Sequence, residues 1–327
     1  MKIGKVPTAF LRDKIIGKTG KKRPEVLVGA GIGEDCAVLD LNNQLCVIST
    51  DPITGAVAEI GSLAVHIACN DVASDGAEPV GVLLTVLAPS RTTEEDLEQI
   101  MNDASEAAES ISVQIMGGHT EITDTVNQVV ISTVAIGRQK REQIIKSAGA
   151  QIDDVVVMTK NAGLEGASIL ALDKAGELTG KVEEKLLNEA REQKNYISVV
   201  PEGILAGKIG VNSMHDATEG GILGALWELA EASQTGIEIQ MEKIPLLPST
   251  KAICEYYGLD PYRLISSGVM IMTVKSEKVS ELMSEFEKQG IEAAVIGKII
   301  PEHRLIQTEK ESLPLEAPDV DELYKVL

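Results

Sequence analysis

The fold of this chain is decided by residues 31–51, which read GIGEDCAVLDLNNQLCVISTD. Two short β-rich runs, 35–39 and 45–49, flank the turn signal DLNN, and this pattern predicts a β-hairpin. In an antiparallel hairpin, the start of the first strand lies beside the end of the second. We therefore expect Asp35 and Asp51 to lie together at one end of a sheet.

Helices and strands alternate along the rest of the chain. Hydrophobic spacing predicts a first α/β set, a polar segment at 137–154 and then a second α/β set. Because 327 residues predict two domains, we expect an α/β (α+β) protein with domains at 1–146 and 147–327. The tail at 309–327 is expected to lie at the periphery. The predicted strands are 80–88, 113–116, 128–136, 155–159, 269–274 and 293–300, and the predicted helices are 61–74, 92–111, 164–174, 183–195, 198–208, 222–233 and 277–289.

Composition excludes several functional classes. The chain has 30 Lys and Arg against 50 Asp and Glu, a net charge of −20. This charge argues against a nucleic-acid partner, which needs a clustered basic surface. The longest apolar run, 80–88, is too short to span a bilayer. The basic segment 1–24 lacks the apolar core of a secretory signal, and the four cysteines show no CxxC spacing. These features predict a cytoplasmic protein without a membrane partner.

Common nucleotide and metal motifs are incomplete. Gly17-Lys18-Thr19 resembles the end of a Walker A loop, but Arg12 occupies the position of its first glycine. The glycines at 29, 31 and 33 do not complete a dinucleotide-binding loop, because Glu34 stands at the last glycine position. The four histidines do not have the spacing of a zinc site on a helix.

A set of carboxylates remains. Asp71 lies on the apolar face of the helix predicted at 61–74, where an acid is costly unless it is paired or binds a metal. Asp216 precedes another predicted helix. Together with Asp35 and Asp51, and with the hydroxyls of Ser49, Thr50 and Thr218, they form hard oxygen ligands suited to Mg²⁺. Because an acidic protein needs cations to bind a polyphosphate, the set favours metal-bridged nucleotide binding.

Simpler roles are open for each residue in isolation. An aspartate at a strand end is commonly a turn or cap residue. Asp71 could be satisfied by neighbouring backbone, and Gly117-Gly118 could form a plain turn. His119 could equally be a hydrogen-bonded structural histidine.

Several short segments follow one another in a recognisable order. They are GIGEDCAVL at 31–39, STD at 49–51, NDV at 70–72, GAEP at 76–79, GGHT at 117–120, LEG at 164–166, DATEGG at 216–221, DP at 260–261 and SG at 267–268. In this order they resemble segments of thiamine-monophosphate kinase, aminoimidazole ribonucleotide (AIR) synthase, selenophosphate synthetase and the hydrogenase-maturation protein HypE. The chain is thus similar to the AIR synthase-related (PurM-like) ATP-binding superfamily, and most similar to its HypE-like members.

The resemblance implies a fold and a ligand site. The N-terminal domain, 1–146, would bind ATP and metal and form a β-barrel across a homodimer, and the domain at 147–327 would cover it. Mg²⁺ and ATP would lie in the cleft between the domains. The implied metal ligands are Asp35, Ser49, Thr50, Asp51, Asp71 and Asp216; Gly117, Gly118, His119 and Thr218 would bind the nucleotide, and Asp71 is also the expected catalytic residue.

Departures from the relatives leave the substrate undefined. HypE ends in a cysteine that carries a carbamoyl group, whereas this sequence ends Tyr324-Lys325-Val326-Leu327. His119 stands where thiamine-monophosphate kinase and HypE have an acid. The resemblance therefore implies an enzyme that transfers the γ-phosphoryl group of ATP to an amide or carboxylate oxygen. The alternative is a non-catalytic ATP-binding maturation scaffold or partner protein.

Overall fold

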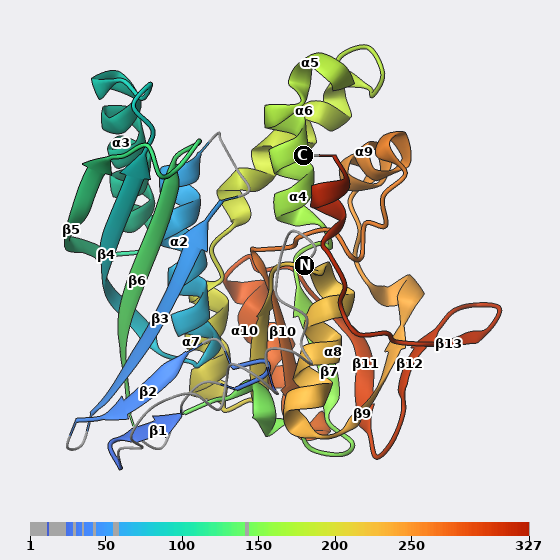
Figure 1. Cartoon of the computed structure of the whole chain (residues 1–327). Coiled ribbons are helices and arrows are strands. Elements are labelled where there is room, and N and C mark those ends of the chain that lie inside the picture. Colours follow the sequence, from blue (N-terminus) through green and yellow to red (C-terminus); the bar gives the residue numbers. More distant parts are fainter. Residues whose placement is uncertain are drawn as a thin grey trace.

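The computed structural model describes residue 12 and residues 24–28, 31–34, 36–41, 44–54, 59–140 and 144–326. Within this part of the chain, two sheets form two α/β halves that follow each other in the sequence (Figure 1). This architecture confirms the predicted two-domain α/β class. The boundary between residues 146 and 147 lies in the segment that joins the sheets, and its position stays a prediction.

The first sheet has six strands in the order β1-β2-β3-β6-β4-β5. The predicted hairpin is confirmed, because β2 and β3 are antiparallel with Ala37 opposite Ile48. Asp35 lies outside the described residues, so its place beside Asp51 stays a prediction. The strands are β1 (Val26–Val28), β2 (Ala37–Asp40), β3 (Leu45–Ile53), β4 (Glu78–Ala88), β5 (Gln114–Ile122) and β6 (Val130–Gln139).

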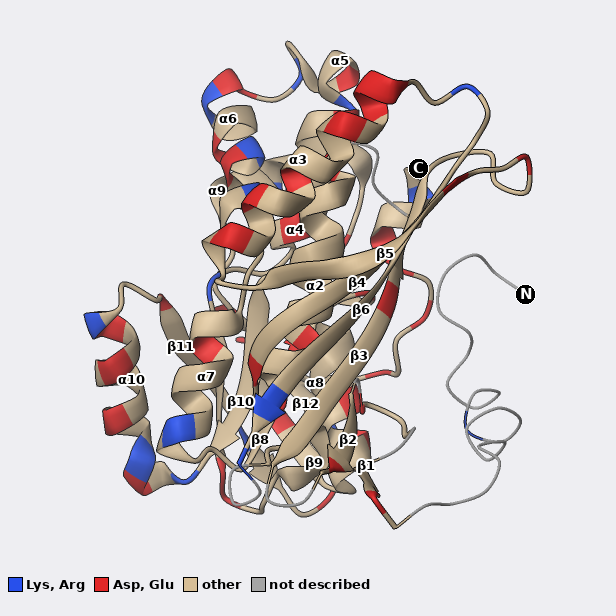
Figure 2. Cartoon of the chain, turned by 90° about the vertical axis from the view of Figure 1, so that its left-hand side faces the viewer, with Lys and Arg blue, Asp and Glu red and all other residues tan. Residues whose placement is uncertain are grey.

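Two helices lie on one side of this sheet. α2 (Ile60–Ser74) packs on β3, β4 and β6, and α3 (Glu94–Ser110) packs on α2 and β5. α3 begins two residues later than predicted because Thr93 caps it: Thr93 Oγ1 accepts from Asp96 N at 3.1 Å, and Asp96 Oδ2 accepts from Thr93 N at 2.9 Å. Figure 2 looks onto the opposite face of the sheet, which no described helix covers.

The second sheet has seven strands in the order β13-β12-β9-β11-β7-β10-β8. Three of its strands match the predictions, and the sequence reading missed the others. They are β7 (Val155–Thr159), β8 (Ser213–Ala217), β9 (Gly236–Gln240), β10 (Val269–Val274), β11 (Ala293–Ile300), β12 (Arg304–Gln307) and β13 (Ser312–Pro314).

The helices of the second half lie around this sheet (Figure 1). Among the described residues, no helix has both the length and the apolar character needed to cross a membrane. The helices are α4 (Leu164–Asp173), α5 (Ala175–Leu178), α6 (Glu184–Glu192), α7 (Val200–Ile209), α8 (Gly221–Ser233), α9 (Pro248–Tyr257) and α10 (Val279–Lys288).

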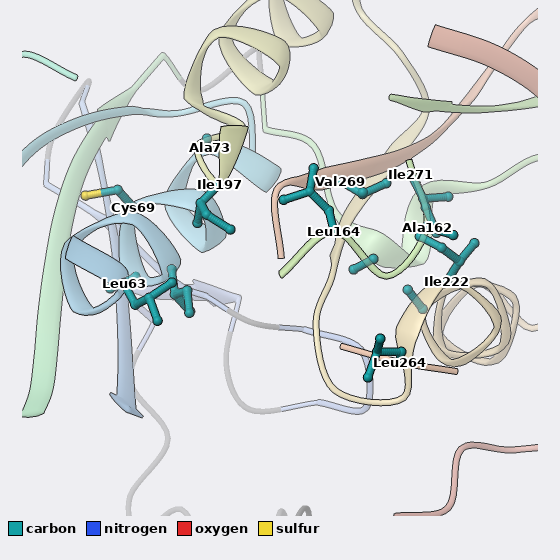
Figure 3. Close-up of a cluster of buried hydrophobic side chains, with 14 of the residues drawn as sticks. Leu63, Cys69, Ala73, Ala162, Leu164, Ile197, Ile222, Leu264, Val269 and Ile271 are labelled. Carbon is teal, nitrogen blue, oxygen red and sulfur yellow. The ribbon is translucent and has the colours of Figure 1, made fainter. Parts of the chain in front are cut away.

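α2 joins the two halves. It is buried on nearly all sides, because the first sheet lies on one side and α7 and β8 lie against another. The amide of Asn70 donates to Ile197 O and accepts from Val199 N, both at 2.8 Å. Figure 3 shows Leu63 and Ala73 of α2 in a buried cluster that continues through the second half. The helix that carries Asp71 is therefore fixed to both halves.

The expectation of a peripheral tail holds for most of residues 309–320, which are largely exposed, but it is wrong for residues 321–323. Asp321 and Leu323 are buried. Asp321 accepts from Gly220 N at 2.6 Å and from Ile265 N at 3.2 Å, so the last segment is fastened to the loop that follows β8. The acids and prolines of the tail suggested a solvated end. The carboxylate of Asp321 can be buried because three backbone amides donate to it, the third being that of Leu323 at 2.8 Å.

Candidate functional site

The first part of the site lies between β3 and α2. Ser49 Oγ donates a hydrogen bond to Asp71 Oδ2, and Asp71 is only 4% exposed. Side chains alternate between the faces of a strand. Asp51 therefore points to the same face as Ser49, toward α2, whereas Thr50 points to the opposite, uncovered face. The structure brings Ser49, Asp51 and Asp71 to one side of the sheet and leaves the side chain of Thr50 on the other.

The second half contributes Asp216 from β8. Asp216 is 1% exposed. Met214, two residues earlier, packs in the cluster formed with α7 and α10, so Asp216 points to this same face of the sheet. The neighbouring His215 points the other way, where its Nε2 lies 3.1 Å from Glu228 Oε2 of α8. Since α2 packs against both α7 and β8, Asp216 lies on the side of its sheet that adjoins the helix of Asp71.

A tight loop places Thr218 between β8 and α8. Gly220 and Gly221 have φ values of 86° and 63°, which disfavour other residues. A Cβ at Gly221 would also lie 2.6 Å from Tyr262 O. The two glycines thus let the chain turn directly from the strand into α8, with Thr218 next to the strand end that carries Asp216.

The glycine pair and His119 lie elsewhere in the first sheet. They are inside strand β5, so the simpler alternative of a plain turn is wrong. A continuous row of paired residues runs from Asp51 through Thr133 and Leu84 to Gly118. Three strand spacings, about 14 Å, separate the ends of this row. Within one chain, the structure does not bring Gly117, Gly118 and His119 to the carboxylates.

His119 points to the uncovered face. A row of paired residues runs from His119 through Thr85 and Ser132 to Pro52. Pro52 lies two residues after Thr50, so it shares the face of Thr50 and not that of Asp51. The exposed Nε2 of His119 is 3.3 Å from Glu121 Oε2. Thr50 and His119 therefore share one face of the sheet, and Ser49 and Asp51 share the other. The φ of Gly118 is 149°, and a Cβ there would overlap Leu84 O. The backbone therefore requires glycine at this position.

The carboxylates suit a magnesium ion in chemical type. Ser49, Asp51, Asp71 and Asp216 offer only oxygen donors. Among the described residues, which do not include Asp35, no group of three or more His, Cys, Asp or Glu side chains is close enough to hold a metal ion. The ligand set inferred from the resemblance stays a prediction.

The sequence reading missed Lys160. This residue follows β7, and its Nζ lies 2.5 Å from Glu202 Oε1 of α7. The same ammonium donates to Ser198 O at 2.7 Å and to Gly268 O at 2.8 Å. Burial lowers the pKa of Lys160, and the charge of Glu202 opposes this shift. A lone lysine directly after a largely apolar strand was the available signal.

Comparisons with known proteins agree with this architecture. Residues 33–139 match the N-terminal domain of AIR synthase related protein, and residues 151–308 match its C-terminal domain. A protein of Methanocaldococcus jannaschii named for hydrogenase expression/formation is 30% identical over 312 residues, covering 92% of this chain and 90% of that protein. This chain belongs to the AIR synthase-related family. Among family members, carbamoyl dehydratase HypE of Rhizobium leguminosarum bv. viciae is 27% identical, covering 82% of this chain and 77% of HypE.

Solved structures of AIR synthase-related proteins share the fold. HypE in complex with ATP superimposes with a TM-score of 0.71 at 20% identity, covering 98% of this chain and 97% of HypE. AaThiL, complexed with AMPPCP and TMP, gives a TM-score of 0.71 at 19% identity, and the match covers 86% of this chain and 89% of AaThiL. A chain of the HypE–HypF complex gives a TM-score of 0.72 at 24% identity, and the match covers 88% of this chain and 94% of that chain. These likenesses establish the two-domain fold predicted from the motifs.

Proposed function

We propose that this chain binds ATP with Mg²⁺ at the junction of its two halves and transfers the γ-phosphoryl group to an amide or carboxylate oxygen. The observation that carries the proposal is the buried Asp71, which accepts from Ser49 and lies on the helix that adjoins β8 and Asp216. Buried acids at an interface between two α/β halves are costly unless charge compensates them. The ATP complex of the similar HypE fold supports nucleotide as the ligand.

Different residues of the chain have different roles in the proposed reaction. Asp51, Asp71 and Asp216 would hold Mg²⁺, which neutralises phosphate charge when bound. Ser49 fixes the orientation of Asp71 through their hydrogen bond. Asp71 also positions the acceptor, and transfer makes the acceptor oxygen a leaving group. Thr218, next to the N-terminus of α8, would bind phosphate oxygens.

We also propose that a second copy of the chain covers the open face of the first sheet. Val80, Leu83 and Met116 of β4 and β5 are exposed apolar residues, and few charges lie on the strands seen in Figure 2. Burying such a face is favourable. A homodimer formed there would close the sheets into a barrel. It would also place His119 and its glycine pair at an interface instead of in solvent.

An ADP-release assay tests the enzymatic proposal. A panel of small amides and carboxylates is offered with ATP and Mg²⁺, and at least one class is expected to raise ADP release above the rate without acceptor. Asp216→Asn should lower the stimulated rate about a hundredfold, since removing a group that holds transition-state charge costs ~2.7 kcal/mol or more. Asp124→Asn, which changes an exposed acid, is the matched control.

Two results of this assay would count against phosphoryl transfer. One is an Asp216→Asn rate equal to that of Asp124→Asn. The other is ATP binding without acceptor-stimulated ADP release in any class, which would favour the alternative of a maturation scaffold that closes on nucleotide.

A further inference from the structure

A small cavity opens between the two halves, next to the candidate site. It has a volume of about 60 Å³, enough for a few water-sized groups. Pro52 of β3 and Thr54, which follows the strand, form one wall. The lining acids are Glu165 of α4, Glu219 of the loop after β8 and Asp321 of the tail, which also contributes Tyr324. Ile53 also lines the cavity and lies two residues after Asp51 on the same face of β3, so the cavity adjoins the proposed phosphoryl-transfer site.

Three carboxyl groups line this volume. Glu165, Glu219 and Asp321 each come from a different segment, and no Lys or Arg is among the described residues that line the cavity. Burial raises the pKa of Glu165 from its ordinary 4.5 to about 7, with the charges of Asp321 and Glu219 adding to the shift and contacts with Ser267 offsetting part of it. Burial likewise raises the pKa of Asp321 to about 6, against the effect of its backbone hydrogen bonds. The cavity therefore holds three acids and no described basic residue, and a bound cation there would favour the charged form of each acid.

Glu165 differs from the other two acids in its contacts. Asp321 accepts from the backbone amides of Gly220, Ile265 and Leu323. Glu219 accepts from the hydroxyl of Tyr324 at 3.0 Å. Ser267 contacts the carboxyl group of Glu165. Glu165 is nevertheless 3% exposed, and its Oε2 has no hydrogen-bond partner in the part of the chain that the structure describes. A buried carboxyl oxygen without a partner costs stability, and a ligand in the cavity would remove that cost.

We propose that this cavity binds a cationic head group of the acceptor substrate, an ammonium or a guanidinium, with Glu165 as its counter-ion. A cation compensates the charge of all three acids at once, whereas a neutral hydrogen-bond donor compensates none of that charge. The inference rests on the proposed function, because it makes the acceptor an amine-bearing compound. Its amide or carboxylate oxygen would then reach Asp51 and Asp71 while its charged end lies against Glu165.

Calorimetric titration with small probes tests this subsite. Methylguanidinium and ethylammonium chloride are titrated at constant ionic strength, with N-methylurea and ethanol as neutral counterparts of similar shape. Both cations are expected to bind the wild type, and neither neutral probe should bind measurably. Glu165→Gln, which keeps the shape but removes the charge, should weaken cation binding at least tenfold. Glu255→Gln, at an exposed position of α9, should bind like the wild type.

Binding of ATP with Mg²⁺ is measured on the same samples, so that the two proposals fail separately. Glu165→Gln should bind the nucleotide like the wild type. Three outcomes would overturn the subsite even where nucleotide binding is intact: no cation binding to the wild type, equal cation affinity in Glu165→Gln, or equal affinity for N-methylurea. Loss of nucleotide binding in the wild type would instead overturn the proposed function.

Discussion

Lys160→Met is expected to lower the free energy of unfolding by about 3–5 kcal/mol, the range for breaking one side of a buried ion pair. Glu202 is 1% exposed and its carboxylate lies 2.5 Å from the Lys160 ammonium. The substitution leaves that carboxylate buried without its cation. It also removes the donor for the carbonyls of Ser198 and Gly268.

Urea unfolding followed by circular dichroism measures this loss. Lys251→Met is the matched control, because Lys251 is exposed and lies 3.9 Å from Glu255, a pair that contributes ~0.5 kcal/mol at most. The double variant Lys160→Met/Glu202→Gln should recover part of the stability, since it removes the isolated charge. A loss of less than ~1 kcal/mol in Lys160→Met, or a double variant no better than the single one, would contradict this role.

The Lys160–Glu202 ion pair matters for the candidate site because Lys160 also binds the segment that contacts α2. Ser198 is adjacent to Val199, whose backbone amide donates to Asn70 of α2. Asn70 immediately precedes Asp71. Lys160 thus connects the end of β7, the start of α7 and the helix that carries the proposed magnesium ligand.

Glu165→Gln is expected to change the pH dependence of stability by on the order of 3 kcal/mol, because a tenfold change in an acid's dissociation constant between the folded and unfolded states corresponds to about 1.4 kcal/mol. The pKa of Glu165 is raised from 4.5 to about 7 by burial and by Asp321 and Glu219. Folding therefore favours its neutral form. Wild-type stability should fall as the pH rises from about 4.5 to 7, and should then level off with respect to this group.

Urea unfolding of the wild type and Glu165→Gln at pH 5 and pH 8, without added ligand, isolates the effect. The variant should gain stability relative to the wild type between these two values, because it has no charge to bury. Burial lowers the pKa of His66 to about 4 and raises that of Asp321 to about 6, but both groups are present in both proteins and largely cancel. A stability difference that is the same at pH 5 and pH 8 would show that Glu165 does not change its charge in this range.

Strong local patterns made much of the fold predictable. The turn between two β-rich runs gave the hairpin, and the apolar periodicity around Asp71 gave α2. The strands at 155–159, 269–274 and 293–300 are runs dominated by apolar residues, and all three are present. The chain order of the short motifs then indicated the family, which the domain matches confirm.

Features that depend on tertiary contacts could not be predicted. β12 and β13 are short strands at one edge of the second sheet, and short edge strands bury little apolar surface, so their pattern is weak. The adjacent residues of Ser49-Thr50-Asp51 were grouped as ligands, but a strand sends neighbours to opposite faces. The role of Asp321 depends on backbone amides about 100 and 56 positions away, a distance at which residue spacing carries no information.

Calorimetric titration of ATP tests the central claim most directly. It is carried out with and without Mg²⁺ on the wild type and on Asp71→Asn, which keeps the size of the side chain that accepts from Ser49. We expect binding to the wild type that needs Mg²⁺ and that weakens at least tenfold in Asp71→Asn, a change of ~1.4 kcal/mol or more. Affinity that is the same with or without Mg²⁺ and in both proteins, or no binding at all, would contradict it.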